Sequence, residues 1–144
     1  MRALLWCNGQ QPSETVVQGL LEGAVCFGVD GGADRAAEAG YAVEQVLGDL
    51  DSIDADRWRS RTYELADQSS SDLAKSLSLL IERGYDEIDV VGSDGGATSH
   101  FFGSWAALCE APSGAAIRLH HEDSVTYRVH PQEGEREFAV RSGG

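Results

Sequence analysis

Short apolar segments alternate with amphipathic segments along most of the chain. A short apolar segment is typical of a buried strand, and apolar residues three or four positions apart are typical of a helix that packs on one side. This pattern predicts strands over residues 3–7, 24–29, 45–47, 62–65, 87–91 and 116–119. It predicts helices within residues 13–23, 33–40, 54–60, 71–84 and 98–108. Because strands alternate with helices, we expect an α/β fold in which helices cover both faces of a parallel sheet.

The amphipathic segments also indicate which side chains form the core. After Ser71, which can cap a helix, apolar residues recur at helical spacing until Gly84, so one stripe of that helix is expected to be buried. The residues that we expect in the core are Leu77, Leu80, Val90 and Trp105.

The pattern changes after His120. Residues 124–129 and 136–140 are each typical of a strand, and the turn Pro131–Gly134 joins them without a helix between. This arrangement predicts a hairpin that begins a different, antiparallel unit. About the last 25 residues are available for it, which is too few for an independent domain.

Composition narrows the class of protein. The chain has 144 residues, of which 42% are hydrophobic, so it can form one domain with a real core. Its net charge is −13 and Lys75 is its only lysine, and we therefore expect no nucleic-acid partner. No apolar run approaches the roughly 20 residues of a membrane span. The start reaches Asn8-Gly9 too soon for a signal peptide, so we expect a protein that acts away from the membrane.

The cysteines indicate a reducing compartment. Cys7, Cys26 and Cys109 are an odd number and lack the spacing of a metal site. Cys7 and Cys26 lie in apolar, strand-like segments, where a buried free thiol is the ordinary situation. We therefore expect a cytoplasmic protein.

An acidic stretch, Gly48-Asp49-Leu50-Asp51-Ser52-Ile53, follows one of the predicted strands. In an extended segment alternate side chains share a side, so Asp49 and Asp51 point the same way. Two such carboxylates are stable only in bulk water or beside a cation, and Mg²⁺ prefers hard oxygen ligands of this kind. The alternative is a solvated acidic turn in which Ser52 caps a helix. Taken by itself, the acidic stretch favours this alternative.

Two further turns shift the balance towards a ligand site. Asp30-Gly31-Gly32 and Gly92-Ser93-Asp94-Gly95-Gly96 also follow predicted strands, and ligands of parallel α/β sheets bind where the strands end. Asp72 and Lys75 lie three apart at the start of a helix and therefore share a face. Lys75 either contacts phosphate or forms a surface ion pair with Asp72. His100 near the start of an apolar helix reads first as a structural histidine.

With these residues together, the chain resembles the catalytic domain of thiamin pyrophosphokinases. The resemblance covers about residues 3–119, and the Gly-Asp-x-Asp-Ser core is specific when the Asp-Gly-Gly turn accompanies it. The residues that carry it are Asp30-Gly31-Gly32-Ala33-x-Arg35, Gly48-Asp49-Leu50-Asp51-Ser52-Ile53, Gln68 with Ser71-Asp72-x-x-Lys75-x-Leu77, and Gly95-Gly96 followed by His100.

The resemblance implies a Rossmann-like α/β sandwich that transfers the diphosphate of ATP to the hydroxyl of thiamin. It implies Mg²⁺ held by Asp49, Asp51 and Asp72, with Lys75 as a further catalytic residue. It also implies that the nucleotide is bound by Asp30, Gly31, Gly32, Arg35, Ser52, Gln68, Gly95, Gly96 and His100. Diphosphate transfer depends mainly on positioning and on cancelling phosphate charge, which suits this set of residues.

The resemblance also implies a second unit and a partner. Family members continue into a C-terminal β-sandwich that helps to bind thiamin. We therefore expect a catalytic α/β domain over residues 1–119 and the start of an incomplete β-sandwich over residues 120–144. The family further suggests a homodimer in which the subunits share the thiamin site.

The chain departs from the family pattern beside the expected site. Ser69 and Ser71 stand where the family usually has Asp and Thr, and Ala97 and Ser99 stand where it has Arg and Asp. An arginine offers a planar cationic fork that alanine cannot replace. We therefore expect this chain to make little or no thiamin diphosphate. The alternative function is a non-catalytic nucleotide-binding or regulatory domain, and a pure assembly module fits the clustered aspartates least.

Overall fold

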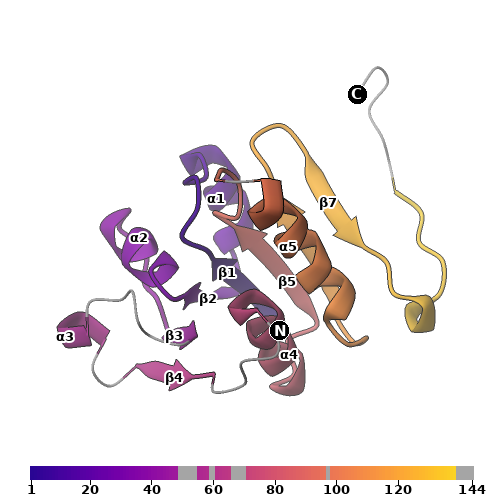
Figure 1. Cartoon of the computed structure of the whole chain (residues 1–144), viewed down its shortest axis with the longest axis horizontal. Coiled ribbons are helices and arrows are strands. Elements are labelled where there is room, and N and C mark those ends of the chain that lie inside the picture. Colours follow the sequence, from indigo (N-terminus) through magenta and orange to yellow (C-terminus); the bar gives the residue numbers. More distant parts are fainter. Residues whose placement is uncertain (49–54, 59–60, 66–70, 97, 139–144) are drawn as a thin grey trace.

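One seven-stranded sheet forms the centre of the protein in the computed structural model (Figure 1). The structure describes residues 1–48, 55–58, 61–65, 71–96 and 98–138. The strands lie in the order β4-β3-β2-β1-β5-β6-β7, and every neighbouring pair is parallel except β6 with β7. Their bounds are β1 Arg2–Trp6, β2 Ala24–Val29, β3 Gln45–Gly48, β4 Thr62–Glu64, β5 Glu87–Val91, β6 Ala116–His120 and β7 Val125–Arg128.

Helices connect the parallel strands, as the alternating pattern predicts. Two of them begin at a serine whose hydroxyl accepts a backbone N–H: Ser13 bonds Val16, and Ser71 bonds Ala74. The predicted α/β class, with a mostly parallel sheet, is therefore confirmed. The helices are α1 Glu14–Leu21, α2 Gly32–Glu38, α3 Ala55–Trp58, α4 Asp72–Glu82 and α5 Thr98–Glu110, followed by the 3₁₀ helix η1 Pro131–Glu133.

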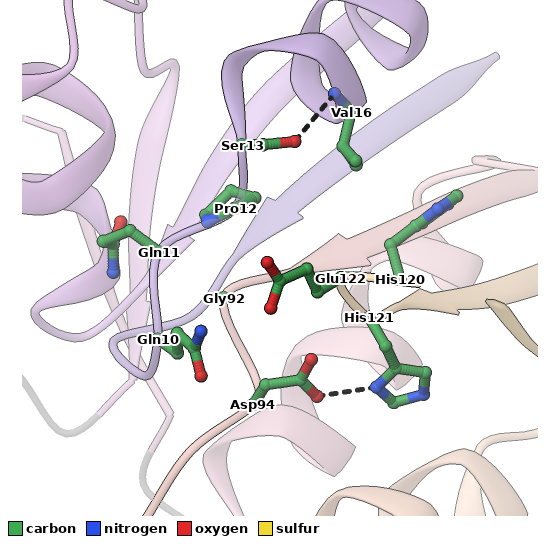
Figure 2. A pocket seen from close by; sticks show the side chains of 10 residues that line it. All are labelled: Gln10, Gln11, Pro12, Ser13, Val16, Gly92, Asp94, His120, His121 and Glu122. Carbon is green, nitrogen blue, oxygen red and sulfur yellow. Dashed lines mark hydrogen bonds and ion pairs between the residues drawn. The ribbon is translucent and has the colours of Figure 1, made fainter. Parts of the chain in front are cut away.

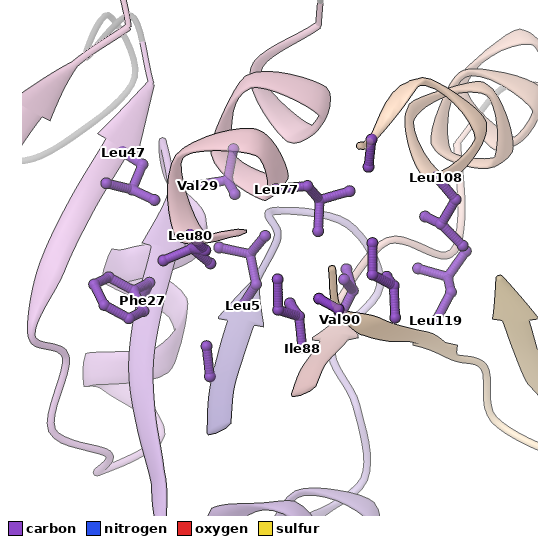
Figure 3. Close-up of a cluster of buried hydrophobic side chains, with 14 of the residues drawn as sticks. Leu5, Phe27, Val29, Leu47, Leu77, Leu80, Ile88, Val90, Leu108 and Leu119 are labelled. Carbon is purple, nitrogen blue, oxygen red and sulfur yellow. The ribbon is translucent and has the colours of Figure 1, made fainter. Parts of the chain in front are cut away.

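The sheet has a packed layer on each face. On one face, α4 and α5 cover Leu5, Phe27 and Ile88 with Leu77, Leu80, Leu108 and their neighbours (Figure 3). On the other face, α1, α2 and α3 contribute apolar side chains that pack on Leu4, Trp6, Cys26, Val46 and Val91. Among the residues that the structure describes, no helix is long and apolar enough to cross a membrane.

The expected core residues are buried, with one exception. Leu77, Leu80 and Val90 are fully buried, as predicted. Trp105 is 42% exposed, so its assignment to the core is wrong. The buried side of α5 instead carries Ser104, Ala107 and Leu108, and Ala111 directly after the helix continues this spacing. Trp105 lies one position round from this stripe and meets Phe102 edge to face on the outer side.

The centre of the sheet is a topological switch point. The chain adds β2, β3 and β4 on one side of β1, and then returns to add β5 on the other side. Crossover connections on the two sides of β1 leave in opposite directions, and this opens a crevice at the carboxyl ends of β1 and β5. A ligand site is therefore expected at this point.

The C-terminal segment extends the sheet instead of forming a hairpin of its own. β7 pairs antiparallel with β6, and Ile117 lies opposite Arg128. The second predicted strand, residues 136–140, is wrong for residues 136–138, which are not in a strand, while residues 139–140 lie outside the described residues. The turn at Pro131 is the 3₁₀ helix η1. The division of the chain at residues 119 and 120 stays a prediction.

Candidate functional site

A cavity of about 650 Å³ opens at the carboxyl ends of the central strands. It lies at the switch point, where the fold favours ligand binding. Two carboxylates line it, Asp30 from the end of β2 and Asp72 from the start of α4. The other lining residues are Cys7–Gly9 after β1, Val29, Ser71, Leu73, Ser93 after β5, and Gly103–Ser104 in α5.

Asp30 has the only positive φ of a non-glycine residue in the described chain, at 48°. This region costs strain for most residues, and Asp is among those that tolerate it. The Asp30 N–H donates to Leu47 O at 2.8 Å, and its carbonyl accepts from Ala33. The side chain packs on Gly48, where an added Cβ would collide with the carboxylate. The strained backbone thus holds Asp30 against the residue that precedes Asp49.

The Asp30-Gly31-Gly32 turn brings α2 close to β1. A Cβ at Gly32 would collide with the carbonyl oxygen of Trp6, and a Cβ at Gly28 would collide with Ala33. Gly31 is the N-cap of α2 at φ −63°, which any residue can adopt. Close packing at Gly32 therefore accounts for the second glycine of the motif. The same packing fixes the path of the chain directly after β2, where Asp30 lies.

Asp72 and Lys75 form an ion pair beside the cavity. Lys75 Nζ lies 3.2 Å from Asp72 Oδ1 and donates to the carbonyl of Leu65 at 3.1 Å. Lys75 is largely shielded from water, so the reading as a surface ion pair does not describe it. Lys75 therefore connects the start of α4 to the residue that follows β4, and its positive charge lies next to the Asp72 carboxylate.

Neutral hydrogen-bonding groups also line this cavity. Arg35 Nε donates to Asn8 Oδ1 at 3.2 Å, which turns the Asn8 amide so that its nitrogen remains available to donate. Ser93 is 3% exposed, and its hydroxyl has no hydrogen-bond partner in the part of the chain that the structure describes. The cavity therefore combines two acidic side chains with two neutral donors.

The loops that follow β1 and β5 are joined by backbone hydrogen bonds. The N–H of Gly9 donates to Gly92 O and that of Gln10 to Asp94 O, both at 2.6 Å, and Gln10 and Asp94 form an isolated antiparallel bridge. A Cβ at Gly9 would collide with the carbonyls of Gly92 and Asp94, so the close approach requires glycine there. These contacts fix the edge of the cavity.

A second, smaller cavity of about 140 Å³ lies on the α1 side of this bridge (Figure 2). Asp94 and His121 point toward one another there, and His121 Nδ1 lies 2.6 Å from Asp94 Oδ1. The other ring nitrogen, Nε2, lies 2.8 Å from Thr126 Oγ1 in β7. His121 thus links the glycine-rich loop to the edge strand.

Cys7 lines the larger cavity but is not suited to act as a nucleophile there. Burial, together with the smaller effect of the Asp30 charge, raises the pKa of the Cys7 thiol to about 12. The thiolate is the reactive form of cysteine, so this side chain stays inert at neutral pH. Burial likewise raises the pKa of Cys26 to about 12. The site therefore depends on charge and positioning.

The structure brings some of the predicted site residues together and leaves others undescribed. Asp30 and Asp72 meet in the cavity, Arg35 reaches it through Asn8, and Lys75 reaches it through Asp72. Gly95 packs on Gln10 outside the cavity lining, and Gly96 adopts a positive φ of 78°. Asp49, Asp51, Ser52 and Gln68 lie outside the described residues, as does the side chain of His100.

Asn8 and Ser93 are among the lining residues that were not singled out from the sequence. Asn8 directly follows a predicted strand, so the rule that ligands bind at strand ends could have identified it. Ser93 lies in the predicted glycine-rich turn, but nothing in its sequence context shows that its hydroxyl is buried and unpaired. No group of three or more His, Cys, Asp or Glu side chains is placed to hold a metal within the described ranges.

Comparison with known proteins identifies the family of the chain. The family described as "Thiamin pyrophosphokinase, catalytic domain" matches residues 18–119, which is more than half of the chain. The chain belongs to this family. The matched residues include β2 to β6 and both carboxylates of the cavity.

Solved structures of thiamin pyrophosphokinases have the same fold. A probable thiamine pyrophosphokinase from Staphylococcus saprophyticus is 28% identical, with a TM-score of 0.65 over 83% of this chain and 65% of that chain. The thiamine pyrophosphokinase from Bacillus subtilis is 24% identical, with a TM-score of 0.70 over 83% of this chain and 60% of that one. The chain thus spans less than two thirds of these relatives. A search of curated proteins finds no match.

Proposed function

We propose that this thiamin pyrophosphokinase-like chain binds a magnesium nucleotide in the cavity at the switch point, for transfer of diphosphate from ATP to thiamin. The meeting of Asp30 and Asp72 in this cavity, from positions 42 apart in the chain (72 − 30), carries the proposal. Membership of the family supports it. Asp30 and Asp72, which line the cavity, are two of the residues that the family resemblance assigns to the site.

The chemistry of the cavity suits Mg²⁺. Carboxylate oxygens of Asp30 and Asp72, which both line the cavity, are hard ligands of the kind that Mg²⁺ prefers. Asp30 also packs against Gly48, the residue before Asp49. We propose that Asp49, Asp51 and Asp72 hold the metal and that Asp30 supports it. When bound, Mg²⁺ neutralises charge on the phosphate oxygens.

The chain's own residues perform the remaining tasks. Asp72 is oriented by Lys75, and we propose that this lysine also screens phosphate charge at the start of α4. Gly31, Gly32, Gly95 and Gly96 shape the turns around the nucleotide. In the reaction, the thiamin hydroxyl forms a bond to the β-phosphorus, the bond to the α-phosphate oxygen breaks, and AMP leaves. Positioning and electrostatics accomplish such transfers without a covalent nucleophile.

We further propose the family's wider organisation for this chain. Residues 120–144 would begin a β-sandwich that contributes to thiamin binding, and two subunits would share that site in a cytoplasmic homodimer. Membership of the family is the support for this organisation. Nucleic acid is an unsuitable partner because the net charge is −13.

The first test is nucleotide binding. The cavity offers two carboxylates to an anionic ligand, so ATP is expected to bind at least tenfold more tightly with Mg²⁺ than without it. Asp72→Asn should weaken the binding of magnesium ATP by about tenfold or more, because one charge-assisted contact is lost. Calorimetric titration measures both effects.

Asp86→Asn is the matched control for this titration. Asp86 directly precedes β5, at the amino ends of the strands and therefore away from the cavity, and it pairs with the N-terminal amino group at 2.9 Å. Its replacement should leave ATP binding unchanged. Equal binding with and without Mg²⁺, or full affinity in Asp72→Asn, would contradict the proposed site.

The second test is turnover with ATP, Mg²⁺ and thiamin. Ala97 and Ser99 replace charged residues of the family pattern, and losing one preorganised contact typically costs about 3 kcal/mol, or roughly a hundredfold in rate. We therefore expect little or no thiamin diphosphate when the products are separated by chromatography. Binding without turnover would favour the alternative, a non-catalytic nucleotide-binding or regulatory domain. Turnover of about one per second, an ordinary enzymatic rate, would show that the missing charges are not needed.

A further inference from the structure

Ser93 has a buried hydroxyl that the fold itself does not use. The residue is 3% exposed, and among the described residues its Oγ has no hydrogen-bond partner. Burying a hydroxyl without a partner costs stability, and most buried polar side chains are therefore paired. Ser93 also lines the cavity that contains Asp30 and Asp72. A partner supplied by a ligand would remove this cost.

The other serines that line the cavity are already occupied. The hydroxyl of Ser71 accepts the N–H of Ala74 at 3.2 Å as the N-cap of α4. Ser104 also has an interaction of its own. Of the three serines that line the cavity, Ser93 alone lacks a partner within the described part of the chain.

The backbone around Ser93 is held in place on both sides. Gly92 accepts the N–H of Gly9, and Asp94 accepts the N–H of Gln10, both at 2.6 Å. His121 bonds the carboxylate of Asp94 at 2.6 Å (Figure 2). The position of the Ser93 Cα is therefore fixed, and rotation about one bond moves its hydroxyl among three staggered positions. A donor on a fixed backbone needs little reorganisation when a ligand binds.

A neutral donor at this place suits an anionic ligand. β1 and β5 are neighbouring strands, and Asn8 after β1 and Ser93 after β5 both line the cavity. Arg35 occupies Asn8 Oδ1 and leaves the amide nitrogen to donate. The carboxylates of Asp30 and Asp72 repel phosphate in the absence of a cation. The amide nitrogen of Asn8 and the hydroxyl of Ser93 are donors that would orient the phosphate oxygens.

We propose that Ser93 is a ligand-binding residue, whose hydroxyl donates a hydrogen bond to a phosphate oxygen of the nucleotide in this cavity. This inference rests on the proposed function and adds a residue that the family resemblance does not assign. It also predicts which part of the ligand the hydroxyl recognises. The hydroxyl recognises the diphosphate group, so inorganic diphosphate should use it as ATP does.

The test is calorimetric titration of the whole chain with magnesium ATP and with magnesium diphosphate. A hydrogen bond to a charged group corresponds to a loss of about tenfold or more in affinity. Ser93→Ala should therefore weaken both ligands by a similar factor. Equal affinities in Ser93→Ala and the unchanged protein would overturn the inference. A loss for ATP without a loss for diphosphate would overturn it as well.

Ser76→Ala is the matched control. Ser76 in α4 is fully buried, and its hydroxyl likewise has no partner in the described residues, but it does not line the cavity. Its replacement should leave both affinities unchanged. A loss of affinity in Ser76→Ala equal to that in Ser93→Ala would mean that the effect is general, and this would overturn the inference.

Thermal unfolding without ligand separates binding from a structural role. Removing an unpaired buried hydroxyl should leave the midpoint unchanged or raise it in both variants. A lower midpoint in Ser93→Ala would indicate that the hydroxyl supports the fold, and would count against the inference. If the unchanged protein binds neither ligand, the proposed function itself fails. If it binds both and Ser93→Ala binds them equally well, only the role of Ser93 fails.

Discussion

Replacing Asp89 by asparagine is expected to lower the free energy of unfolding by about 3 kcal/mol, the range for breaking a buried ion pair. The Asp89 side chain is 2% exposed in the middle of β5. It accepts two hydrogen bonds from Arg118, at 2.7 and 3.1 Å, and lies 2.7 Å from His120 Nε2. Asparagine leaves the Arg118 cation without its carboxylate. Urea unfolding at pH 7 measures the loss.

Glu87→Gln is the control for this change. Glu87 lies two residues earlier on the same strand and pairs with Arg2 at 3.2 Å, but its side chain is 43% exposed. Exposed ion pairs contribute about 0–1 kcal/mol, so this variant should lose less than 1 kcal/mol. Similar losses in both variants would show that burial does not decide the contribution of Asp89.

The effect of Asp89→Asn should depend on pH. Burial raises the pKa of Asp89, but hydrogen bonds from His120 and Arg118 outweigh burial and hold the pKa below its usual range. The unfolded chain then binds more protons in acid, so the stabilisation is present above about pH 4, the ordinary aspartate value, and is lost as the pH falls through the folded pKa. The gap in stability between the two proteins should therefore narrow below about pH 4.

Replacing Arg128 by methionine is expected to cost about 3 kcal/mol, since several hydrogen bonds from a buried charge are lost. Arg128 is buried in β7 and donates to the carbonyls of Ala111, Pro112 and Ala115 at 2.7, 3.1 and 2.9 Å. It also bonds Glu133 at 3.2 Å. These contacts tie the end of α5 to the edge strand. Methionine fills similar space but leaves the carbonyls without this donor.

Arg136→Met separates the backbone contacts from the ion pair. Arg136 binds the other oxygen of the same carboxylate, Glu133 Oε2, at 2.9 Å, but its side chain is partly exposed and donates to no carbonyl of this group. We expect a loss below 1 kcal/mol for this variant. Urea unfolding of both variants at pH 7 makes the comparison. Equal losses would mean that the Glu133 pair, and not the carbonyls at the end of α5, accounts for the role of Arg128.

The sequence predicts the strands well because each is short, apolar and fully buried. The bounds of β2 and β5 agree with those expected from their apolar runs. The orientation of α5 could not be read in the same way, because its apolar residues are adjacent in the sequence, at positions 101–102 and 105–108. Trp105 and Phe102 are exposed, while the smaller Ala107 and Ala111 face the sheet. Periodicity identifies a helix, but it does not identify the covered face when both faces are apolar.

The hydrophobic pattern also could not predict which strand pairs with which. Alternation over residues 124–129 predicts a strand, and β7 is found there. The alternation does not say whether the next strand lies before or after it, and the partner is β6. Glu133 and η1 help to decide the outcome, since Gly114 N–H donates to Glu133 Oε1 and Ser113 bonds Gln132. These contacts use the segment that was expected to turn back as a hairpin.

The candidate site was predictable where it follows from strand ends. Asp30 and Asp72 meet because parallel strands end at one edge of the sheet, and this rule requires no coordinates. The bond from Lys75 to the carbonyl of Leu65 could not be predicted, because it depends on how β4 and α4 meet. The unpaired hydroxyl of Ser93 could not be predicted either, since the absence of a partner is a property of packing and not of spacing.

The central place of β1 has a consequence for biosynthesis. β1 is synthesised before the other strands of this sheet, but Arg2 to Trp6 pair on one side with Glu87 to Val91, which are made 85 residues later (87 − 2). Until then one edge of β1 has no strand to pair with, and an open edge is a template for pairing with another chain. The larger cavity needs Asn8 and Ser93 from the two sides of that same junction. One late segment therefore closes the exposed edge of the nascent chain and completes the lining of the larger cavity.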